Sequence, residues 1–256
     1  MNRTGLLIAL AIAAVTGLLF GFYPQLDLAV ARYFYGFADS ANNMFAMRVY
    51  PPAMLARDAG LWVGTVLIAP AVAALVFKLL LPRRKILLSG RAILFLMATM
   101  ALGPGLLVNV ILKDHWHRPR PIDVQQFGGA EHFMPWWDPR GDCPNNCAFV
   151  SGDVAGAFWT IAPAALAPPQ WRALAYGAAL TLGAGMAAVR VMAGGHFVSD
   201  VIFAGVFTFL IIWLAHGLIY RWPRTRLDDA DVERALERAA MPGYNFIVGL
   251  FGKRKP

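Results

Sequence analysis

Charged side chains are scarce in this chain. Only 15% of its 256 residues are Asp, Glu, Lys or Arg, whereas 58% are hydrophobic. Because an ordinary soluble domain carries about 25% charged residues, this composition excludes that class and indicates a membrane protein with several spans. The net charge of +8 is therefore assigned loop by loop, since Lys and Arg concentrate on the cytoplasmic side of membrane proteins. No nucleic-acid partner is expected.

Cysteine is almost absent. The two cysteines, Cys143 and Cys147, lie four positions apart in a polar loop. Two thiols alone make a poor metal site, so no metal is expected here. Four positions is a short separation for a disulfide, and such a bond requires a loop that faces an oxidising compartment. The sequence leaves a local disulfide and two free thiols equally open.

Long apolar runs, in contrast, are frequent. Six of them approach the roughly 20 residues that a bilayer crossing needs. The first run is preceded only by Arg3 and is longer than the apolar core of a signal peptide, which predicts an anchor that is retained. Residues 23–60 are too polar to span and predict a loop with short amphipathic helices at the interface. The predicted spans are residues 5–22, 61–81, 92–112, 149–167, 173–193 and 198–220.

The sequence therefore predicts an all-α polytopic membrane protein with six transmembrane helices and both termini cytoplasmic. One membrane-integral domain is predicted over residues 1–256, with a core of about 60–220 and a cytoplasmic tail over 221–256. This orientation places most basic loop residues inside, as the positive-inside rule requires. These inside residues are Arg3, Arg83, Arg84, Lys85, Arg91, Arg172, Arg221, Arg224, Arg226 and Lys253-Arg254-Lys255.

Unusual polar residues fall at the predicted outer ends of the spans. Lys113 and Arg120 follow the third span, Ser151-Gly152 opens the fourth, and Arg190 ends the fifth. Three cations beside the amides of a helix N-terminus make a site for a dianionic phosphate. Arginine forks also match phosphate oxygens and stabilise charge on a transferring phosphoryl group. The pattern indicates phosphate chemistry at the outer face.

A histidine and an aspartate lie between the fifth and sixth spans. Gly194-Gly195 precedes His196, and Asp200 follows His196 at i+4. If a helix begins near His196, the two side chains share a face, and the carboxylate fixes the imidazole tautomer and leaves the other nitrogen free to attack. Taken alone, the same residues equally describe a satisfied His–Asp pair beside a snorkelling Arg190.

Together these residues resemble the motifs of the type 2 phosphatidic acid phosphatases, which are Lys-x6-Arg-Pro, Pro-Ser-Gly-His and Ser-Arg-x5-His-x3-Asp. The chain matches the first and third motifs with Lys113-x6-Arg120-Pro121 and Arg190-x5-His196-x3-Asp200. In the third motif, Val189 stands in place of the serine. The resemblance covers roughly residues 60–220, and the six-span layout with an outer site is similar to that of bacterial members.

The resemblance implies a mechanism without metal or cofactor. His196 would attack phosphorus to give a phosphohistidine that water hydrolyses, and Asp200 would hold His196 in the reactive tautomer. The substrate would be a membrane lipid with a phosphate head group, at the periplasmic face of a bacterial inner membrane. The implied phosphate-binding residues are Lys113, Arg120, Ser151, Gly152 and Arg190.

The second motif departs from the family. The chain reads Val150-Ser151-Gly152-Asp153, so Asp153 stands where the family has the histidine that protonates the leaving group. An aspartate beside three cations is expected to be ionised at neutral pH and a poor general acid. Asp153 either caps the fourth helix, acts as a base for the hydrolytic water, or receives a proton that the phosphate brings. His115, His117 and His132 are the alternative proton donors.

The sequence leaves the lipid open among lipid A, undecaprenyl or other polyprenyl (di)phosphates, phosphatidylglycerophosphate and phosphatidic acid. A weak general acid favours a good leaving group, such as the phosphate of a lipid diphosphate. Two rival functions are a phosphotransferase that passes the phosphoryl group to another lipid, and a non-catalytic lipid-binding or transport protein. Transport is disfavoured because the charges gather at one membrane face instead of the midplane.

Overall fold

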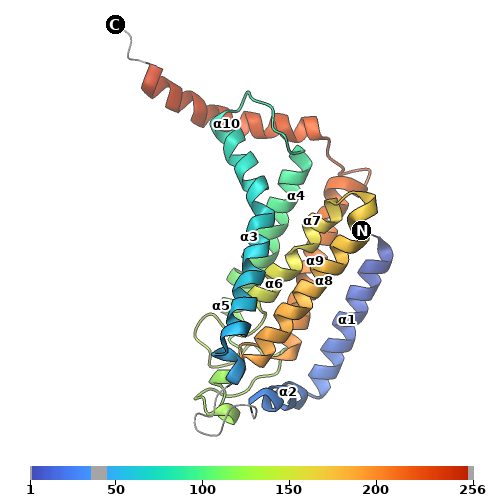
Figure 1. Cartoon of the computed structure of the whole chain (residues 1–256), viewed down its shortest axis with the longest axis vertical. Helices are drawn as coiled ribbons and strands as arrows, with labels where there is room; N and C mark the ends of the chain where they lie inside the picture. Colours follow the sequence, from blue (N-terminus) through green and yellow to red (C-terminus); the bar gives the residue numbers. More distant parts are fainter. Residues whose placement is uncertain (1, 36–44, 253–256) are drawn as a thin grey trace. The chain divides into compact units, whose positions relative to one another are not determined.

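The computed structural model describes residues 2–35 and 45–252 (Figure 1). The described part is all-helical, as predicted, and contains no strand beyond one isolated bridge between Val124 and Glu131. The helices are α1 Arg3–Phe22, α2 Gln25–Tyr35, η1 Ala46–Arg48, α3 Pro51–Leu80, α4 Gly90–Met100, η2 Ala101–Leu112, α5 Lys113–His115, η3 Pro121–Asp123, η4 Gln125–Phe127, α6 Gly152–Trp159, α7 Ile161–Leu166, α8 Pro169–Met192, α9 Val198–His216, η5 Gly217–Arg221 and α10 Asp229–Gly252.

Five stretches of helix in the described chain are long and apolar enough to cross a bilayer. They are Arg3–Phe22, Pro51–Leu80, Gly90–His115, Pro169–Met192 and Val198–Arg221. These stretches confirm five of the six predicted apolar spans as helices. The second one begins at Pro51 instead of residue 61, because the helix continues past its apolar part through the charged side chains of Arg57 and Asp58. An apolar run in the sequence thus indicates only the apolar part of a helix, and the helix itself extends further.

The predicted fourth span, residues 149–167, is not one continuous helix, so a sixth spanning helix is not confirmed in the described chain. Two short helices, α6 and α7, meet at Thr160. Pro163 explains the break, because it has no N–H to donate to the carbonyl of Trp159. The Thr160 hydroxyl donates to the carbonyl of Ala157 at 2.7 Å. The helices lie against α8 (Figure 1), and protein packing of this kind tolerates a broken helix at membrane depth.

Parts of two other predictions fall outside the described residues. The predicted loop over residues 23–60 does contain short helices, α2 and η1, but its residues 36–44 are not described. The basic Lys253-Arg254-Lys255 also lies outside the description. The cytoplasmic placement of both termini therefore stays a prediction.

The chain divides into two compact units. One comprises residues 1–64 and 99–213, and the other comprises residues 65–98 and 214–256. In the second unit, the buried ammonium group of Lys78 pairs with Glu233 at 3.2 Å and Glu237 at 3.6 Å, which ties α10 to α3. The predicted single domain over residues 1–256 stays a prediction.

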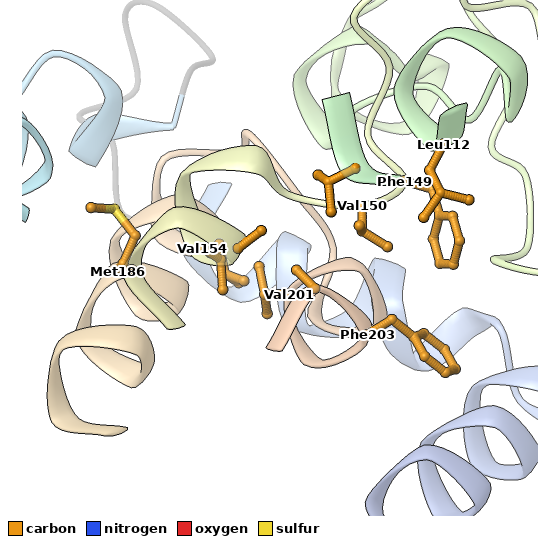
Figure 2. Packing of buried hydrophobic residues seen from close by; sticks show 12 residues of the cluster. Leu112, Phe149, Val150, Val154, Met186, Val201 and Phe203 are labelled. Atoms are coloured by element: carbon orange, nitrogen blue, oxygen red, sulfur yellow. The ribbon is translucent and has the colours of Figure 1, made fainter. Parts of the chain in front are cut away.

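The apolar core of the first unit joins the elements that carry the predicted site. Trp116 stacks on the buried ring of Phe149, with 4.9 Å between the ring centres. Burial of each such side chain stabilises the fold by about 1.5–3 kcal/mol. The core therefore holds the end of η2, the start of α6, the end of α8 and the start of α9 together. Figure 2 labels Leu112, Phe149, Val150, Val154, Met186, Val201 and Phe203 of this cluster.

A buried ionic cluster lies in the same unit. The side chain of Arg118 is fully buried and donates to Asp27 Oδ2 and to Ser199 Oγ, each at 2.8 Å, and to Asp200 Oδ1. Its Nε donates to the carbonyl of Met134 at 2.9 Å. One guanidinium thus connects α2, the segment that follows α5, and the start of α9. Removing one partner of a buried ion pair leaves an uncompensated charge, which costs far more than the loss of an exposed pair.

Replacing Arg118 with Met should therefore destabilise the protein by about 3–5 kcal/mol, and should lower the apparent Tm in detergent by about 10 °C. Arg140→Met is the matched control, because Arg140 pairs with Asp138 while its own side chain is 78% exposed. Thermal unfolding of both variants checks this. Equal Tm values for Arg118→Met and Arg140→Met would contradict the structural role of the buried cluster.

Candidate active site

His196 lies in the turn between α8 and α9 and is only 2% exposed. Its Nδ1 lies 2.7 Å from the carbonyl oxygen of Ala148. Because a carbonyl oxygen only accepts, Nδ1 carries the proton in this hydrogen bond. The lone pair of the neutral imidazole is then on Nε2, where it is available as a nucleophile.

The prediction of a hydrogen bond between Asp200 and His196 is wrong, because each side chain has other partners. Asp200 Oδ1 accepts from Arg118, and Oδ2 accepts from the backbone N–H of Phe197 at 2.8 Å. The prediction required His196 to be helical, but α9 begins only at Val198, so the i,i+4 rule does not apply to this pair. In the described residues, the carbonyl of Ala148 orients His196, while Asp200 anchors the helix start.

Two glycines shape the turn before His196. Gly194 has a left-handed φ of 64°, a conformation that is accessible to glycine at little cost. At Gly195, a methyl group would lie 2.5 Å from one nitrogen of the Arg190 guanidinium. Glycine at this position therefore lets Arg190, in the last turn of α8, fold back beside the turn that carries His196.

Asp153 lies between two arginines. Its Oδ2 accepts from Arg57 Nε at 2.7 Å and lies 3.3 Å from Arg190 Nε. The alternative that Asp153 caps the fourth helix is wrong, since the cap is the Ser151 hydroxyl, which accepts from the N–H of Val154 at 3.4 Å. The Asp153 carboxylate is thus held between the guanidinium groups of Arg57 and Arg190.

Arg57 is a site residue that the sequence analysis missed. It comes from the polar first turns of α3, and no motif spacing links it to the other site residues. The only available signal was a charge near the end of an apolar run, which is common at membrane interfaces.

Ser151 and Gly152 lie where the sequence predicts them, at the start of α6. Ser151 is fully buried, and after capping the helix its hydroxyl proton is still available for an acceptor. A methyl group at Gly152 would lie 2.6 Å from Asn109 Oδ1 and 3.4 Å from Lys113 Nζ. The absence of a side chain at Gly152 therefore makes room for the side chain of Asn109, and the ammonium group of Lys113 lies beside the helix start.

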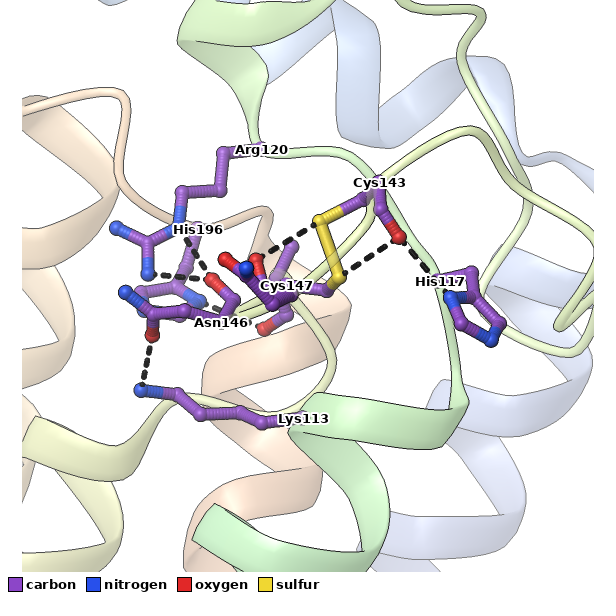
Figure 3. The surroundings of a disulfide bond; sticks show 9 residues. Lys113, His117, Arg120, Cys143, Asn146, Cys147 and His196 are labelled. Atoms are coloured by element: carbon purple, nitrogen blue, oxygen red, sulfur yellow. Dashed lines mark hydrogen bonds between the residues drawn. A yellow bond between two sulfur atoms is a disulfide. The ribbon is translucent and has the colours of Figure 1, made fainter.

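Lys113 and Arg120 meet at Asn146 (Figure 3). Lys113 Nζ donates to Asn146 Oδ1 at 2.9 Å, and Arg120 donates to the Asn146 carbonyl from Nε at 3.2 Å and from a terminal nitrogen at 2.7 Å. Cys143 and Cys147, on either side of Asn146, form a disulfide. The structure thus selects the disulfide from the two states that the sequence left open.

The electrostatic environment keeps His196 neutral. Burial lowers the pKa of His196 well below its usual range, and the positive charges of Arg190, Arg120 and Lys113 lower it further. The same cations that the sequence predicts as phosphate ligands therefore preserve the neutral form of the imidazole.

The three histidines considered as alternative proton donors have other partners. Nδ1 of His115 lies 3.0 Å from the carbonyl of Ile111, and Nδ1 of His117 lies 3.0 Å from the carbonyl of Cys143. The ring of His132 pairs with the exposed Asp142 at 2.8 Å. These contacts describe structural roles and give no support to a catalytic one.

A buried neutral histidine surrounded by cations thus lies at the ends of helices that are long and apolar enough to cross a membrane. The model of the PAP2 superfamily matches residues 90–226. The chain therefore belongs to the type 2 phosphatidic acid phosphatases, and it is a membrane lipid phosphatase of that family. The names of the relatives and the family indicate a hydrolase, in preference to a non-catalytic binding or transport protein.

Three curated relatives carry the name lipid A 4'-phosphatase. One, from Francisella tularensis subsp. novicida (strain U112), is 33% identical over 86% of this chain and 98% of its own length. The protein from Rhizobium leguminosarum is 41% identical over 46% of this chain and 51% of its own length. The protein from Rhizobium etli is 40% identical over 41% of each chain. No solved structure matches this chain.

Proposed function

We propose that this phosphatase hydrolyses a phosphate monoester on the sugar head group of lipid A through a phosphohistidine on His196. The observation that carries the proposal is the free Nε2 of a buried neutral His196 beside Lys113, Arg120 and Arg190. The substrate class is supported by the relative that aligns along 98% of its own length and is named a lipid A 4'-phosphatase.

In the first step, the Nε2 lone pair forms a bond to phosphorus while the bond from phosphorus to the sugar oxygen breaks. The cations bind the non-bridging oxygens and stabilise the charge that gathers on them in the transition state. Arg120 and Arg190 contribute planar guanidinium groups, which match pairs of phosphate oxygens. The Ser151 hydroxyl donates to a further oxygen.

The sugar oxygen leaves as an alcohol and needs a proton. Asp153 is held as a carboxylate by Arg57 and Arg190, so it has no proton to give in the resting enzyme. A phosphate monoester carries one proton below its second pKa of about 6. We infer that the bound monoanion passes this proton to Asp153, which delivers it to the sugar oxygen. A diphosphate leaving group is then not required.

In the second step, water attacks the phosphohistidine. Asp153, again a carboxylate, takes a proton from the water as the new P–O bond forms and the N–P bond breaks. Inorganic phosphate then leaves with that proton, and His196 returns to its neutral form. The role of base for the hydrolytic water, which the sequence analysis left open, thus belongs to the same carboxylate in the second half of the cycle.

We also propose that the chain crosses the inner membrane six times, with α6 and α7 together forming a broken fourth crossing and the site on the periplasmic face. The disulfide beside the site supports this orientation, because disulfides persist in the periplasm and are rare in the cytosol. Lys and Arg in the segments assigned to the inside support it as well. An even number of crossings places both termini on one side of the membrane, and the basic segments make that side the cytoplasmic one.

Phosphate release from a lipid panel tests the proposed function. Purified enzyme should release inorganic phosphate from lipid A faster than from phosphatidic acid, phosphatidylglycerophosphate or a polyprenyl diphosphate. His196→Gln should lower the rate by about 10⁴-fold or more while the protein stays folded. Release from a different lipid only would overturn the substrate, and transfer of labelled phosphate to a second lipid without release would identify a phosphotransferase.

The proton route predicts an unusual pH dependence. Between pH 8 and 6 the monoanion rises from roughly 1% to roughly half of a phosphate monoester. His196 stays neutral over this range, because its pKa is lowered well below the usual value of 6.5. The kcat/KM for lipid A should therefore rise as the pH falls, and Asp153→Asn should remove this rise. A kcat/KM that falls from pH 7 to pH 6 in the unmodified enzyme would indicate that His196 is protonated there and would contradict the route.

A further inference from the structure

The short segment 143–148 contacts three of the predicted site residues at once. The Asn146 side chain accepts from Lys113, the Asn146 carbonyl accepts from Arg120, and the Ala148 carbonyl accepts from His196. The three acceptors lie within three consecutive residues. Figure 3 shows Lys113 and Arg120 approaching Asn146 from two sides, with the disulfide next to it.

Two kinds of bond fix this segment. The disulfide closes a small ring from Cys143 to Cys147 that contains Asn146. Backbone hydrogen bonds then attach the segment to the chain around the first motif, because Cys147 donates to the carbonyl of Lys113 at 3.2 Å and Ala148 donates to the carbonyl of Arg118 at 2.7 Å. The segment is therefore fixed to the chain that carries Lys113 and Arg120.

Asn146 suits this position for a conformational reason. Its φ of 49° lies in the left-handed region, which asparagine tolerates better than most residues with a side chain. In this conformation its side-chain oxygen and its carbonyl oxygen reach two different cations. Only glycine would adopt the backbone more easily, and glycine has no acceptor for Lys113.

We propose that Asn146, held by the Cys143–Cys147 disulfide, is a positioning residue that keeps Lys113 and Arg120 oriented for phosphate. This inference rests on the proposed phosphatase site. The like charges of Lys113 and Arg120 act on each other, so without an acceptor between them the two flexible side chains would separate toward solvent. Asn146 is an uncharged acceptor, and it therefore holds the cations without reducing their net charge.

The donor inventory shows that both cations still have N–H groups for phosphate. An ammonium group has three N–H donors and a guanidinium has five. Lys113 uses one N–H on Asn146, and Arg120 uses one from Nε and one from a terminal nitrogen. The remaining donors of each side chain are available to the substrate. Asn146 thus orients the cations and does not compete for all their donors.

Asn146→Gly tests the side-chain contact, with Asn145→Gly as the matched control. Glycine keeps the left-handed backbone and the carbonyl that holds Arg120, but it removes the acceptor of Lys113. Asn145 is exposed in the same ring, and no side-chain hydrogen bond is recorded for it within the described residues. Loss of a hydrogen bond to a charged group should raise the inhibition constant for orthovanadate about tenfold in Asn146→Gly. Asn145→Gly should leave it unchanged.

Removing the disulfide tests whether the ring acts through Asn146. The double variant Cys143→Ala with Cys147→Ala should weaken orthovanadate inhibition in the parent, and should weaken it less in the Asn146→Gly background, where only the contact of Arg120 with the residue-146 carbonyl remains to be lost. If the double variant does not fold, treatment of the folded parent and folded Asn146→Gly enzymes with a water-soluble phosphine provides the same comparison. If the disulfide does not act through Asn146, its loss should instead weaken orthovanadate inhibition by the same factor in both backgrounds.

The outcomes separate this inference from the proposed function. If the parent releases phosphate from lipid A while Asn146→Gly matches Asn145→Gly in both Tm and orthovanadate inhibition, only the positioning role is overturned. Additive effects of disulfide loss also overturn it. If the parent releases no phosphate from any lipid, the proposed function fails, and binding of orthovanadate, measured by the thermal shift it produces, still decides whether Asn146 supports an anion site.

Discussion

The buried guanidinium of Arg118 is the interaction on which the rest of the site depends. A fully buried charge is tolerated only when its hydrogen bonds are satisfied, and here Asp27, Asp200, Ser199 and Met134 satisfy it. This requirement fixes α2, the chain after α5 and the start of α9 in one arrangement. Backbone hydrogen bonds connect this arrangement to His196. The carbonyl of Arg118 accepts from the N–H of Ala148, and the carbonyl of Ala148 orients His196. His196 is thus two hydrogen bonds away from Arg118.

Around this fixed centre the site is built from cations that need neutral or anionic partners. Lys113 and Arg120 are held by an uncharged asparagine, and Arg57 and Arg190 are held by Asp153. An anionic substrate adds the charge that the cluster lacks in its resting state. The same positive field keeps His196 unprotonated, so in the proposed mechanism substrate binding and nucleophile activation have one physical cause.

Much of the architecture could be predicted because bilayer crossing has a strong signature in composition. Five apolar runs are long helices, and Lys113, Arg120, Arg190 and His196 are brought together in one unit of the fold, as their spacing suggests. The break at Thr160 was also visible in principle, since Pro163 lies within the run. Hydropathy alone did not reveal it, because alanine and proline keep the run apolar.

The contacts of the site could not be predicted to the same depth. The expected bond between Asp200 and His196 depended on where α9 begins, and helix starts are the least certain feature of a sequence pattern. Arg118, Arg57 and Asn146 have no motif of their own that singles them out. Their roles arise from contacts between segments that lie far apart in the chain, as with Arg118 and Asp27, which are 91 positions apart.

Direct detection of the covalent intermediate tests the central claim, that His196 is the nucleophile of a lipid phosphatase. Enzyme mixed with lipid A labelled with ³²P at the 4'-phosphate is quenched within milliseconds in alkali, where a phosphohistidine survives, and the labelled peptide is identified by mass spectrometry. The account predicts an acid-labile, alkali-stable phosphate on His196 that forms and decays at the rate of turnover. Phosphate release at the normal rate with no label on His196, or with label on another residue, would contradict it.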